Sequence, residues 1–333
     1  MNLLCSLAFA GAYELVYQDV ESAGRAHTGA SSTVSPWRNP AGLVGEGPVV
    51  SGNVFVVRSQ VHAQALQTAY DAPWEASTEN PLALAPCLSF AMGGSAWTAG
   101  LVANVPFAGG LRWPADWPRR FEVVASSTRV YRLSPFVGGQ VGPLAVAVGP
   151  HVDFASLAVE KATDHVSEEG FVALQLAGRG LGFDLALHLE METVDLGLVY
   201  RSRSRVGLEG LADFDVPSAF ASTYPDQSVS SSLALPDLVV LGLGWRHLSL
   251  DLAFTTWSVN QQLVFDFESS QDLVQDNRWS NSWALRVGGE QPVGPLVLRG
   301  GVFVDGLTGA PVPAETLSPA SPDSERIGLT FGV

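Results

Sequence analysis

Three arginines stand at alternate positions, 201, 203 and 205. Successive side chains of a β-strand point to opposite faces, so we predict that these three project from the same side. A guanidinium group in a partly desolvated site can hold a carboxylate through two parallel hydrogen bonds. In a membrane strand each would cost about 2–4 kcal/mol facing lipid, so Arg201, Arg203 and Arg205 must line a polar interior or lie beyond the membrane edge. They would bind an anion there, or offset acids such as Asp184 and Asp195.

Two histidines are each followed, two positions later, by an acid on the same face of a predicted strand: His151 with Asp153, and His188 with Glu190. No third metal ligand accompanies either pair, and the sequence lacks a Gly-x-Ser-x-Gly nucleophile motif. We therefore expect no metal, no cofactor and no enzymatic activity. The enzymatic alternative is a lipid hydrolase that depends on His151 or His188.

The segments that carry these residues alternate apolar and polar side chains with a period of two. Residues 183–190 place a phenylalanine and three leucines on one face, and Asp, Ala, His and Glu on the other. Such alternation between clusters of Gly, Pro, Asp and Ser predicts β-strands. We identify twelve of them, at about 48–60, 83–92, 96–106, 124–135, 143–160, 171–190, 194–213, 228–243, 246–268, 279–290, 295–305 and 325–333.

The composition suits strands that face lipid. Hydrophobic residues make up 47% of the chain and charged residues 15%, against about 25% charged residues in soluble domains. Only helices and closed barrels satisfy every backbone group in lipid, so the alternation predicts an all-β fold, a transmembrane antiparallel β-barrel. The net charge of -15 excludes a nucleic-acid-binding protein. Seven tryptophans near predicted strand ends should form interfacial girdles: Trp97, Trp113, Trp117, Trp245, Trp257, Trp279 and Trp283.

One stretch offers a competing interpretation. Residues 80–111 contain no charged side chain, and about 18 apolar residues suffice for a membrane helix. However, Pro81, Pro86, Pro106 and the pair Gly93-Gly94 interrupt it. We predict a hairpin of two strands with its turn at the glycine pair.

The N-terminus carries a short apolar run that ends in Ala-x-Ala. We interpret residues 1–10 as a secretory signal peptide, cleaved after Ala10. The basic region that usually opens such a peptide is missing, which points to an upstream start. After cleavage Cys87 would be the only cysteine, so the sequence offers no disulfide framework.

Residues 22–43 have neither a helical apolar stripe nor a strand alternation. Their small residues permit tight turns, and Arg25, His27 and Asn39 could hold a compact irregular fold by hydrogen bonds. The spacing of three short motifs resembles the N-terminal plug of the FadL/TodX family of outer-membrane transporters for long-chain fatty acids and hydrocarbons. These motifs are Gly24-Arg25-Ala26, Gly29-Ala30 and Asn39-Pro40-Ala41.

Several later blocks resemble the same family in order and spacing, so that the resemblance covers nearly the whole chain. They are Leu198-Val199-Tyr200-Arg201-Ser202, Leu233-Ala234-Leu235-Pro236-Asp237, Thr256-Trp257-Ser258 with Gln261-Gln262-Leu263, and Leu298-Arg299-Gly300-Gly301.

This resemblance implies a monomeric barrel of fourteen strands in the bacterial outer membrane, with a signal peptide at 1–10, a plug at 11–47 and the barrel at 48–333. Such a protein takes up a fatty acid or hydrocarbon from outside and releases it sideways into the outer-membrane lipids. The alternative among barrels is a non-specific porin or a structural barrel. The chain ends at Val333, about two strands before the family would; we expect a truncated reading frame, or else a twelve-stranded variant.

The resemblance also implies roles for individual residues. The extreme N-terminus lines the ligand pocket in the family, which points to Tyr13, Leu15 and Tyr17. Lys161, the only lysine, and Arg278 lie where the family places basic head-group contacts, and Arg201 and Arg203 would add positive charge to the lumen. Gly24, Arg25, Gly29, Asn39, Pro40 and Ala41 would hold the plug fold.

A kinked strand near the start of the barrel makes the lateral gap in the family. Pro106, Phe107 and Gly109 occupy the corresponding place here. Proline cannot donate to a β-ladder and glycine weakens one, so the residues themselves also predict an interruption. The alternative is that Pro106 only ends a strand at a loop.

Overall fold

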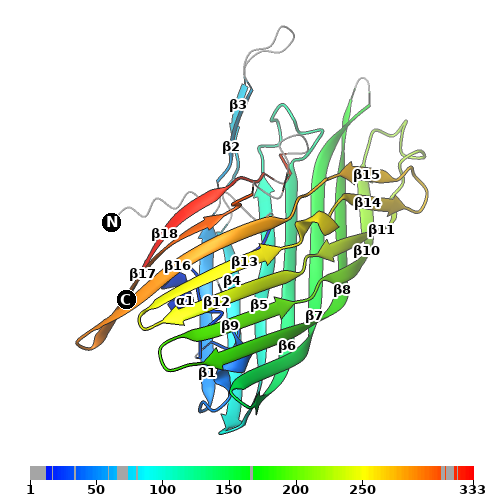
Figure 1. The fold of residues 1–333 in the computed structure, drawn as a ribbon. Coiled ribbons are helices and arrows are strands. Elements are labelled where there is room, and N and C mark those ends of the chain that lie inside the picture. Colours follow the sequence, from blue (N-terminus) through cyan, green and yellow to red (C-terminus); the bar gives the residue numbers. More distant parts are fainter. Residues whose placement is uncertain are drawn as a thin grey trace.

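The fold is a large antiparallel sheet that curves around the N-terminal part of the chain (Figure 1). The computed structural model describes residues 13–16, 18–33, 35–58, 60–65, 74–79, 82–165, 168–308, 312, 319–320 and 322–333. The proposed signal peptide at 1–10 lies outside this part, as does Tyr17. Two short helical segments stand before the sheet, α1 (Val20–Gly24) and the 3-10 turn η1 (Pro40–Leu43).

The twelve predicted strands are confirmed in position and order. Six are continuous: β1 (Val49–Arg58), β4 (Leu82–Gly94), β5 (Trp97–Arg112), β6 (Ala125–Val141), β7 (Leu144–Asp164) and β8 (Glu169–Glu190). Three are broken in two: β9 (Asp195–Arg201) with β10 (Ser204–Asp215), β11 (Gln227–Leu235) with β12 (Leu238–Trp245), and β13 (Leu248–Thr255) with β14 (Gln262–Phe267). The next is β16 (Ser282–Val293), and it is preceded by the short strand β15 (Leu273–Asp276), which lies outside the predicted range 279–290. The last two are β17 (Leu296–Asp305) and β18 (Arg326–Gly332).

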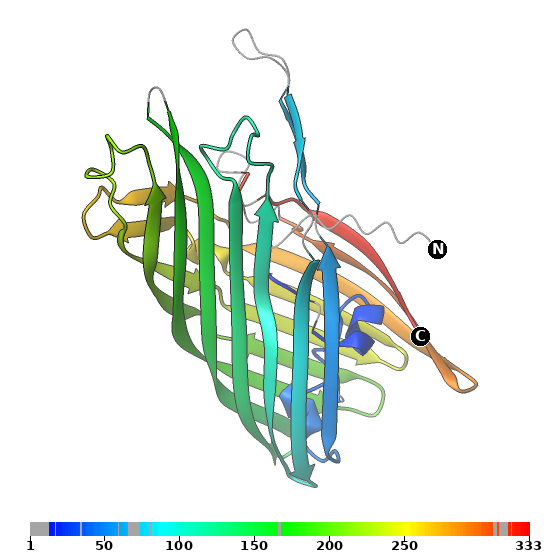
Figure 2. The same cartoon turned by 180° about the vertical axis from the view of Figure 1, so that it is seen from behind.

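Each strand pairs with its neighbours along the chain, in the order β1-β4-β5-β6-β7-β8-β9-β12-β13-β16-β17-β18. Upper halves β10, β11, β14 and β15 continue the wall beside β8. Within the described residues, the edge strands β1 and β18 pair on one side only. Seen from behind, α1 and η1 lie within the curve of the wall (Figure 2).

Over its described part, residues 82–111, the uncharged stretch forms a hairpin and not a helix. β4 and β5 pair from Gly94 with Trp97 onward, and the turn lies at Ser95 and Ala96, directly after the predicted glycine pair. None of the helices in the described ranges is long and apolar enough to cross a membrane. Between β1 and β4 lies a small hairpin that was not predicted from the alternation, formed by β2 (His62–Ala65) and β3 (Trp74–Ser77).

Strand β8 shows how the wall changes character along its length. From Leu181 to Leu189, alternate side chains of its outer face are apolar, while the inner face carries Asp184 and His188. This apolar stretch matches the roughly 9–11 residues that a tilted strand needs to cross a bilayer. Toward the other end of the strand the pattern reverses: the inner face is apolar, and polar residues such as Gln175 face outward. The sheet thus has a zone suited to lipid and, beyond it, a zone suited to water outside and to apolar contents inside.

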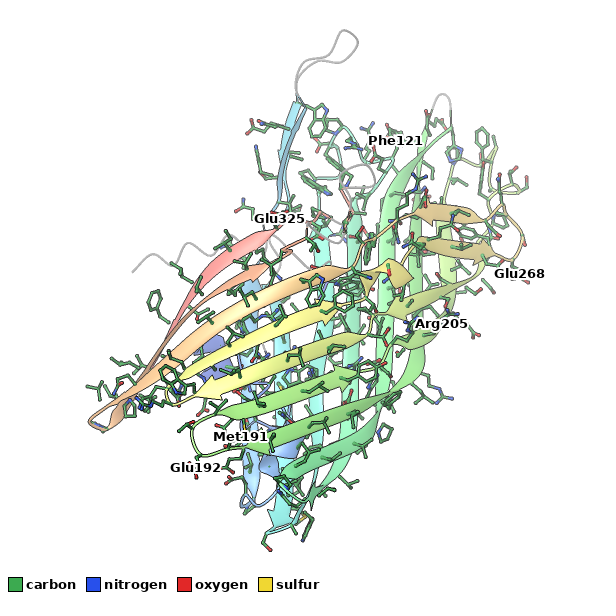
Figure 3. All side chains as sticks on the ribbon, in the orientation of Figure 1. Phe121, Met191, Glu192, Arg205, Glu268 and Glu325 are labelled. Carbon is green, nitrogen blue, oxygen red and sulfur yellow. The ribbon has the colours of Figure 1, made fainter. Side chains whose placement is uncertain are left out.

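The arginine ladder is the main error of the sequence analysis. Arg201 is buried and faces the interior. Arg203 and Arg205 are exposed on the opposite face, and Figure 3 shows Arg205 there. The strand is interrupted at Ser202, whose backbone N–H donates to the Phe183 carbonyl and whose hydroxyl accepts from the Phe183 N–H. This extra residue shifts the alternation, because the side-chain period of a strand is two.

The tryptophan girdle is correct only in part. Trp97, Trp245 and Trp283 are exposed on the outer face. The other four are buried. Trp113 and Trp117 stack on each other in the loop layer, with ring centroids 4.3 Å apart, and Trp257 and Trp279 turn into the interior. Proximity to a strand end therefore did not distinguish a side chain that faces lipid from one that fills the lumen.

Candidate functional site

The segment between Tyr13 and β1 is anchored to the wall through buried polar contacts. Asn39 is fully buried and caps η1 by accepting from the Ala41 N–H at 3.0 Å. Its amide donates to the Ala30 carbonyl at 2.6 Å and to the Leu187 carbonyl of β8 at 3.0 Å. Asn39 therefore ties two turns of the segment to each other and both to the wall.

Two further strands contribute anchors. The Asp251 carboxylate of β13 accepts from the backbone N–H groups of Gly29 (2.8 Å) and Ala30 (3.1 Å). The Thr330 hydroxyl of β18 accepts from Ala26 N–H and donates to the Gly24 carbonyl, at 2.8 and 2.9 Å.

Cationic side chains complete the docking. Arg201 donates to the Trp37 carbonyl and lies 3.8 Å above the Trp37 ring, a cation–π contact. Arg25 lies 3.6 Å from the Glu290 carboxylate. Inside the segment His27 is buried, and burial holds the pKa of its imidazole well below the usual value, so it is neutral. The described residues between Tyr13 and β1 thus lie inside the wall and are held there by these contacts, and we refer to this segment as the plug.

Glycines in the wall allow the plug backbone to approach closely. A Cβ at Gly197 would lie 1.7 Å from the Ala30 carbonyl oxygen, and a Cβ at Gly288 would lie 2.2 Å from that of Arg25. Gly197 pairs with Gly242, and Gly288 with Gly301, across neighbouring strands. Side chains at these positions would occupy the space that the plug backbone now fills.

We therefore predict that Gly288→Leu loosens the plug while the wall still forms. Overpacking of this kind costs about 1–3 kcal/mol, so amide exchange in residues 25–31 should accelerate by roughly tenfold or more. Hydrogen–deuterium exchange with mass spectrometry measures this directly. The matched control is Gly207→Leu, because a Cβ at Gly207 meets nothing within 4 Å. Equal exchange in the two variants would contradict the prediction.

The wall is split between β4 and β5. Their ladder runs from Gly94–Trp97 to Leu88–Ala103 and, over the described residues, extends no further. Beyond this point β5 stays paired with β6 but carries a bulge between Asn104 and Phe107. Strand β5 continues through Pro106 to its end at Arg112, so Pro106 does not end a strand at a loop.

The start of the plug fills the inner side of this split. Glu14 forms an antiparallel bridge with Phe107, the Leu15 N–H donates to the Pro106 carbonyl at 2.8 Å, and the Ala108 N–H donates to the Tyr13 carbonyl at 2.9 Å. The Gln18 amide donates to the Val105 carbonyl at 2.7 Å. Tyr13, Leu15 and Gln18 therefore make hydrogen bonds with the length of β5 that β4 leaves unpaired.

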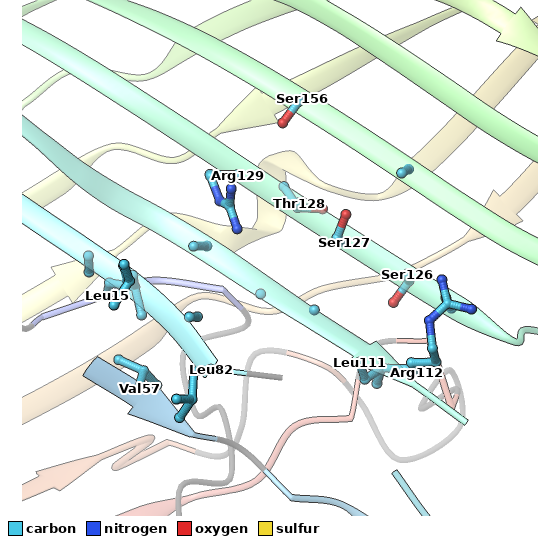
Figure 4. Close-up of a pocket in the computed structure, with 18 of the residues that line it drawn as sticks. Leu15, Val57, Leu82, Leu111, Arg112, Ser126, Ser127, Thr128, Arg129 and Ser156 are labelled. Carbon is cyan, nitrogen blue, oxygen red and sulfur yellow. The ribbon is translucent and has the colours of Figure 1, made fainter. Parts of the chain in front are cut away.

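A cavity of about 300 Å³ opens above this contact, between the separated lengths of β4 and β5 (Figure 4). Leu15, Val57, Leu82 and Leu111 give it apolar walls, and Arg112 lies at one end. Gly109 lies beside it with its Cα facing Tyr13, since a Cβ there would be 3.3 Å from the Tyr13 Cβ. Polar side chains of β6 and β7, among them Ser126, Thr128 and Ser156, line its other side. The cavity thus combines a mixed apolar and polar lining with a contact to the plug.

An aromatic cluster continues from this cavity into the interior. Tyr13 packs against Trp257, Trp279 and Phe107, with ring centroids 5.0, 5.7 and 5.8 Å apart. Burial raises the pKa of the Tyr13 phenol, and its hydroxyl has no hydrogen-bond partner among the described residues. An unsatisfied buried hydroxyl costs about 1–3 kcal/mol. This cost offsets part of the free energy that the Tyr13 ring gains by packing in the cluster.

Similarity to known proteins identifies the family of this chain. The sequence matches, over residues 1–333, the family described as "Outer membrane protein transport protein (OMPP1/FadL/TodX)". This chain belongs to that family. It is therefore a protein of the bacterial outer membrane, in a family of transport channels for hydrophobic molecules. A search of curated proteins found no match to the sequence.

Solved structures of FadL/TodX type share the fold. A FadL homologue of Pseudomonas aeruginosa is 17% identical with a TM-score of 0.82; the alignment covers 95% of this chain and 85% of that one. The toluene transporter TodX of Pseudomonas putida is 17% identical with a TM-score of 0.70, covering 96% and 89%. The toluene transporter TbuX of Ralstonia pickettii is also 17% identical, with a TM-score of 0.67 and coverage of 86% of each chain.

The structure brings some of the predicted site residues together and separates others. Tyr13 and Leu15 lie at the split beside Pro106, Phe107 and Gly109. Lys161 is half-buried near the end of β7. Arg203 pairs with Asp237 on the outer face, and Arg278 is exposed and pairs with Asp276. Of the cations predicted to contact the ligand, Arg203 and Arg278 therefore do not face the aromatic cluster.

Trp257 and Trp279 belong to the aromatic cluster, although they were predicted to lie in the interfacial girdle. Trp257 belongs to the 3-10 turn η2 (Trp257–Val259), which interrupts the strand between β13 and β14, and Trp279 follows β15. Both tryptophans interrupt the strand alternation at the same level of the wall. That coincidence was the available signal, but it becomes visible only when the strand register is known.

Proposed function

We propose that this FadL/TodX family member imports a long-chain fatty acid, working as a monomer and without enzymatic activity. The ligand binds in the apolar interior of the upper wall, displaces residues 13–18, and leaves sideways through the split between β4 and β5 into the outer-membrane lipids. Tyr13, Leu15, Lys161 and Arg201 contribute to the path, and Pro106, Phe107 and Gly109 form its lateral gate.

One observation carries the proposal: the split in the wall is sealed by the plug and not by a strand. Two backbone hydrogen bonds, one hydrogen bond from the Gln18 side chain and the Tyr13 ring hold the seal. A net intramolecular hydrogen bond contributes about 0.5–1.5 kcal/mol. An apolar ligand that fills the aromatic cluster can offset such a sum, since burying one large apolar side chain contributes about 1.5–3 kcal/mol. A pore with a fixed opening would need neither the split nor the seal.

The hydrolase alternative has less support. His151 is buried with its Nδ1 2.9 Å from Asp184 and its Nε2 3.6 Å from Asp153, whose other contacts are two bonds from Arg132. This network lies among the polar contacts of the lower lumen. Within the described ranges, no cluster of three or more His, Cys, Asp or Glu residues could hold a metal ion.

Blocking the cavity tests the proposal. Ala108 lines the cavity beside Leu15, and we predict that Ala108→Trp lowers uptake of labelled long-chain fatty acid by roughly tenfold or more, because overpacking a filled site costs about 1–3 kcal/mol. The control is Ala99→Trp on the same strand, between the exposed Trp97 and Leu101. Uptake by Ala108→Trp at the control rate, at equal amounts in the membrane, would refute release through the split.

A further inference from the structure

We propose that Arg286 and Arg326 form an anion subsite for the ligand's head group, and that Glu14 of the plug occupies it as a built-in competitor. This inference rests on the proposed function, since it concerns the same ligand. It assigns the anionic end of the ligand to β16 and β18, and not to Lys161 or Arg278.

The two arginines converge on one buried carboxylate. Asp305 of β17 accepts from Arg286 through Oδ1 and from Arg326 through Oδ2, both at 3.0 Å. Asp305 and Arg286 are 5% and 6% exposed. Two guanidinium groups thus meet one carboxylate in a nearly dry place. Arg286 Nε is buried there without a hydrogen-bond partner among the described residues, so the cluster retains donor capacity for a second anion.

Glu14 of the plug lies beside the two arginines. Glu14, Arg286, Asp305 and Arg326 line one small cavity of about 20 Å³, enough for a single water molecule. The Glu14 carboxylate accepts one long hydrogen bond, 3.4 Å from Thr255 Oγ1. Burial raises the pKa of the Glu14 carboxyl, and Arg286 acts in the opposite direction without overcoming it. A carboxylate in full contact with two guanidinium groups would have a lowered pKa, so Glu14 satisfies the subsite incompletely.

The subsite is continuous with the aromatic cluster. Trp257 lines the small cavity and also packs on Tyr13. The consecutive residues Tyr13 and Glu14 thus place an apolar ring in the cluster and a carboxyl beside the arginines. An amphiphile with a hydrocarbon chain and a terminal carboxylate presents the same two groups in the same order. The start of the plug is therefore a molecular imitation of the ligand, and binding exchanges one for the other.

The test compares an acid with its matched alcohol. Purified protein binds radiolabelled hexadecanoic acid and 1-hexadecanol, and the ratio of the two affinities is measured for each variant. Arg286→Met should lower the acid affinity by roughly tenfold, as for one charge-assisted hydrogen bond, and leave alcohol binding unchanged. Arg286→Lys keeps the charge and should keep most of the preference. Arg203→Met is the control, because Arg203 also pairs with an aspartate but on the outer face.

Glu14→Ala removes the competitor and should raise the acid-to-alcohol ratio several-fold. An unchanged ratio in both Arg286→Met and Glu14→Ala, with alcohol binding intact, would overturn the subsite and leave the proposed function standing. If Arg286→Met does not fold, Glu14→Ala decides alone by the same criterion. Failure of the wild-type protein to bind either probe would overturn the proposed function, and this inference with it.

Discussion

A disulfide between positions 14 and 107 is expected to abolish uptake reversibly. Glu14 and Phe107 are partners in an antiparallel bridge, where Cα atoms lie about 4.5–5.5 Å apart, within the range that a disulfide spans. The cross-link would fix the start of the plug on β5 and keep the split closed. In a background in which Cys5 and Cys87 are replaced, oxidised Glu14→Cys/Phe107→Cys protein should import labelled fatty acid no faster than vesicles without protein. A reductant should restore transport.

The control is a cross-link that leaves the split alone. Ser51 and Ser89 are register partners on β1 and β4, and a disulfide between cysteines at these positions joins two strands that are already paired. That variant should transport equally well before and after reduction. Full uptake by the 14–107 variant, with the cross-link verified by mass spectrometry, would show that residues 13–18 do not need to leave β5.

The second large effect concerns the other end of the plug. Asn39→Leu keeps the volume of the side chain but leaves the carbonyls of Ala30 and Leu187, and the N–H of Ala41, without the partner each now has. Each buried group left unpaired costs about 1–3 kcal/mol. We expect undocking of the plug to become at least roughly a hundredfold more frequent, which corresponds to about 2.7 kcal/mol.

Single-channel recording in planar bilayers measures that change, because an undocked plug leaves the lumen open to ions. The wild-type protein should conduct poorly, and Asn39→Leu should show frequent openings. The side chain of the exposed Asn281 accepts from the Ser258 N–H at 3.0 Å, and Asn281→Leu is the control, which should behave as wild type. A silent Asn39→Leu channel with normal insertion would contradict the role of Asn39.

The sequence was sufficient for the strands because their information is local. Alternation in β8, for instance, is legible in eight consecutive residues, and the turn after Gly93-Gly94 follows from the glycines themselves. The strand breaks were not legible in this way. At Ser202 the interruption depends on two hydrogen bonds with Phe183 of the neighbouring strand, and it reversed the predicted direction of Arg203 and Arg205.

The site depends even more on distant parts of the chain. The aromatic cluster joins Tyr13 to Trp257 and Trp279, and the arginine pair meets Glu14 only because β16 and β18 pass the start of the plug. Residue type alone indicated that cationic side chains would bind the head group of the ligand. Which cations share a cavity is determined by strand register across the whole sheet, so the residue pattern pointed to Lys161 and Arg278 and gave no sign of the pair Arg286 and Arg326.

The partners of the plug also determine when it can fold. Ala26 is bound by Thr330, 304 positions later, and Asn39 reaches Leu187 across 148 positions. Contacts so distant in sequence are slow to form, because the entropy of closing long loops must be offset first. The glycine wall at Gly288 and Gly301 likewise exists only after β16 and β17 have paired. Although the plug precedes every described strand of the wall in the chain, it is among the last parts to acquire its structure, and during assembly it must wait for β18.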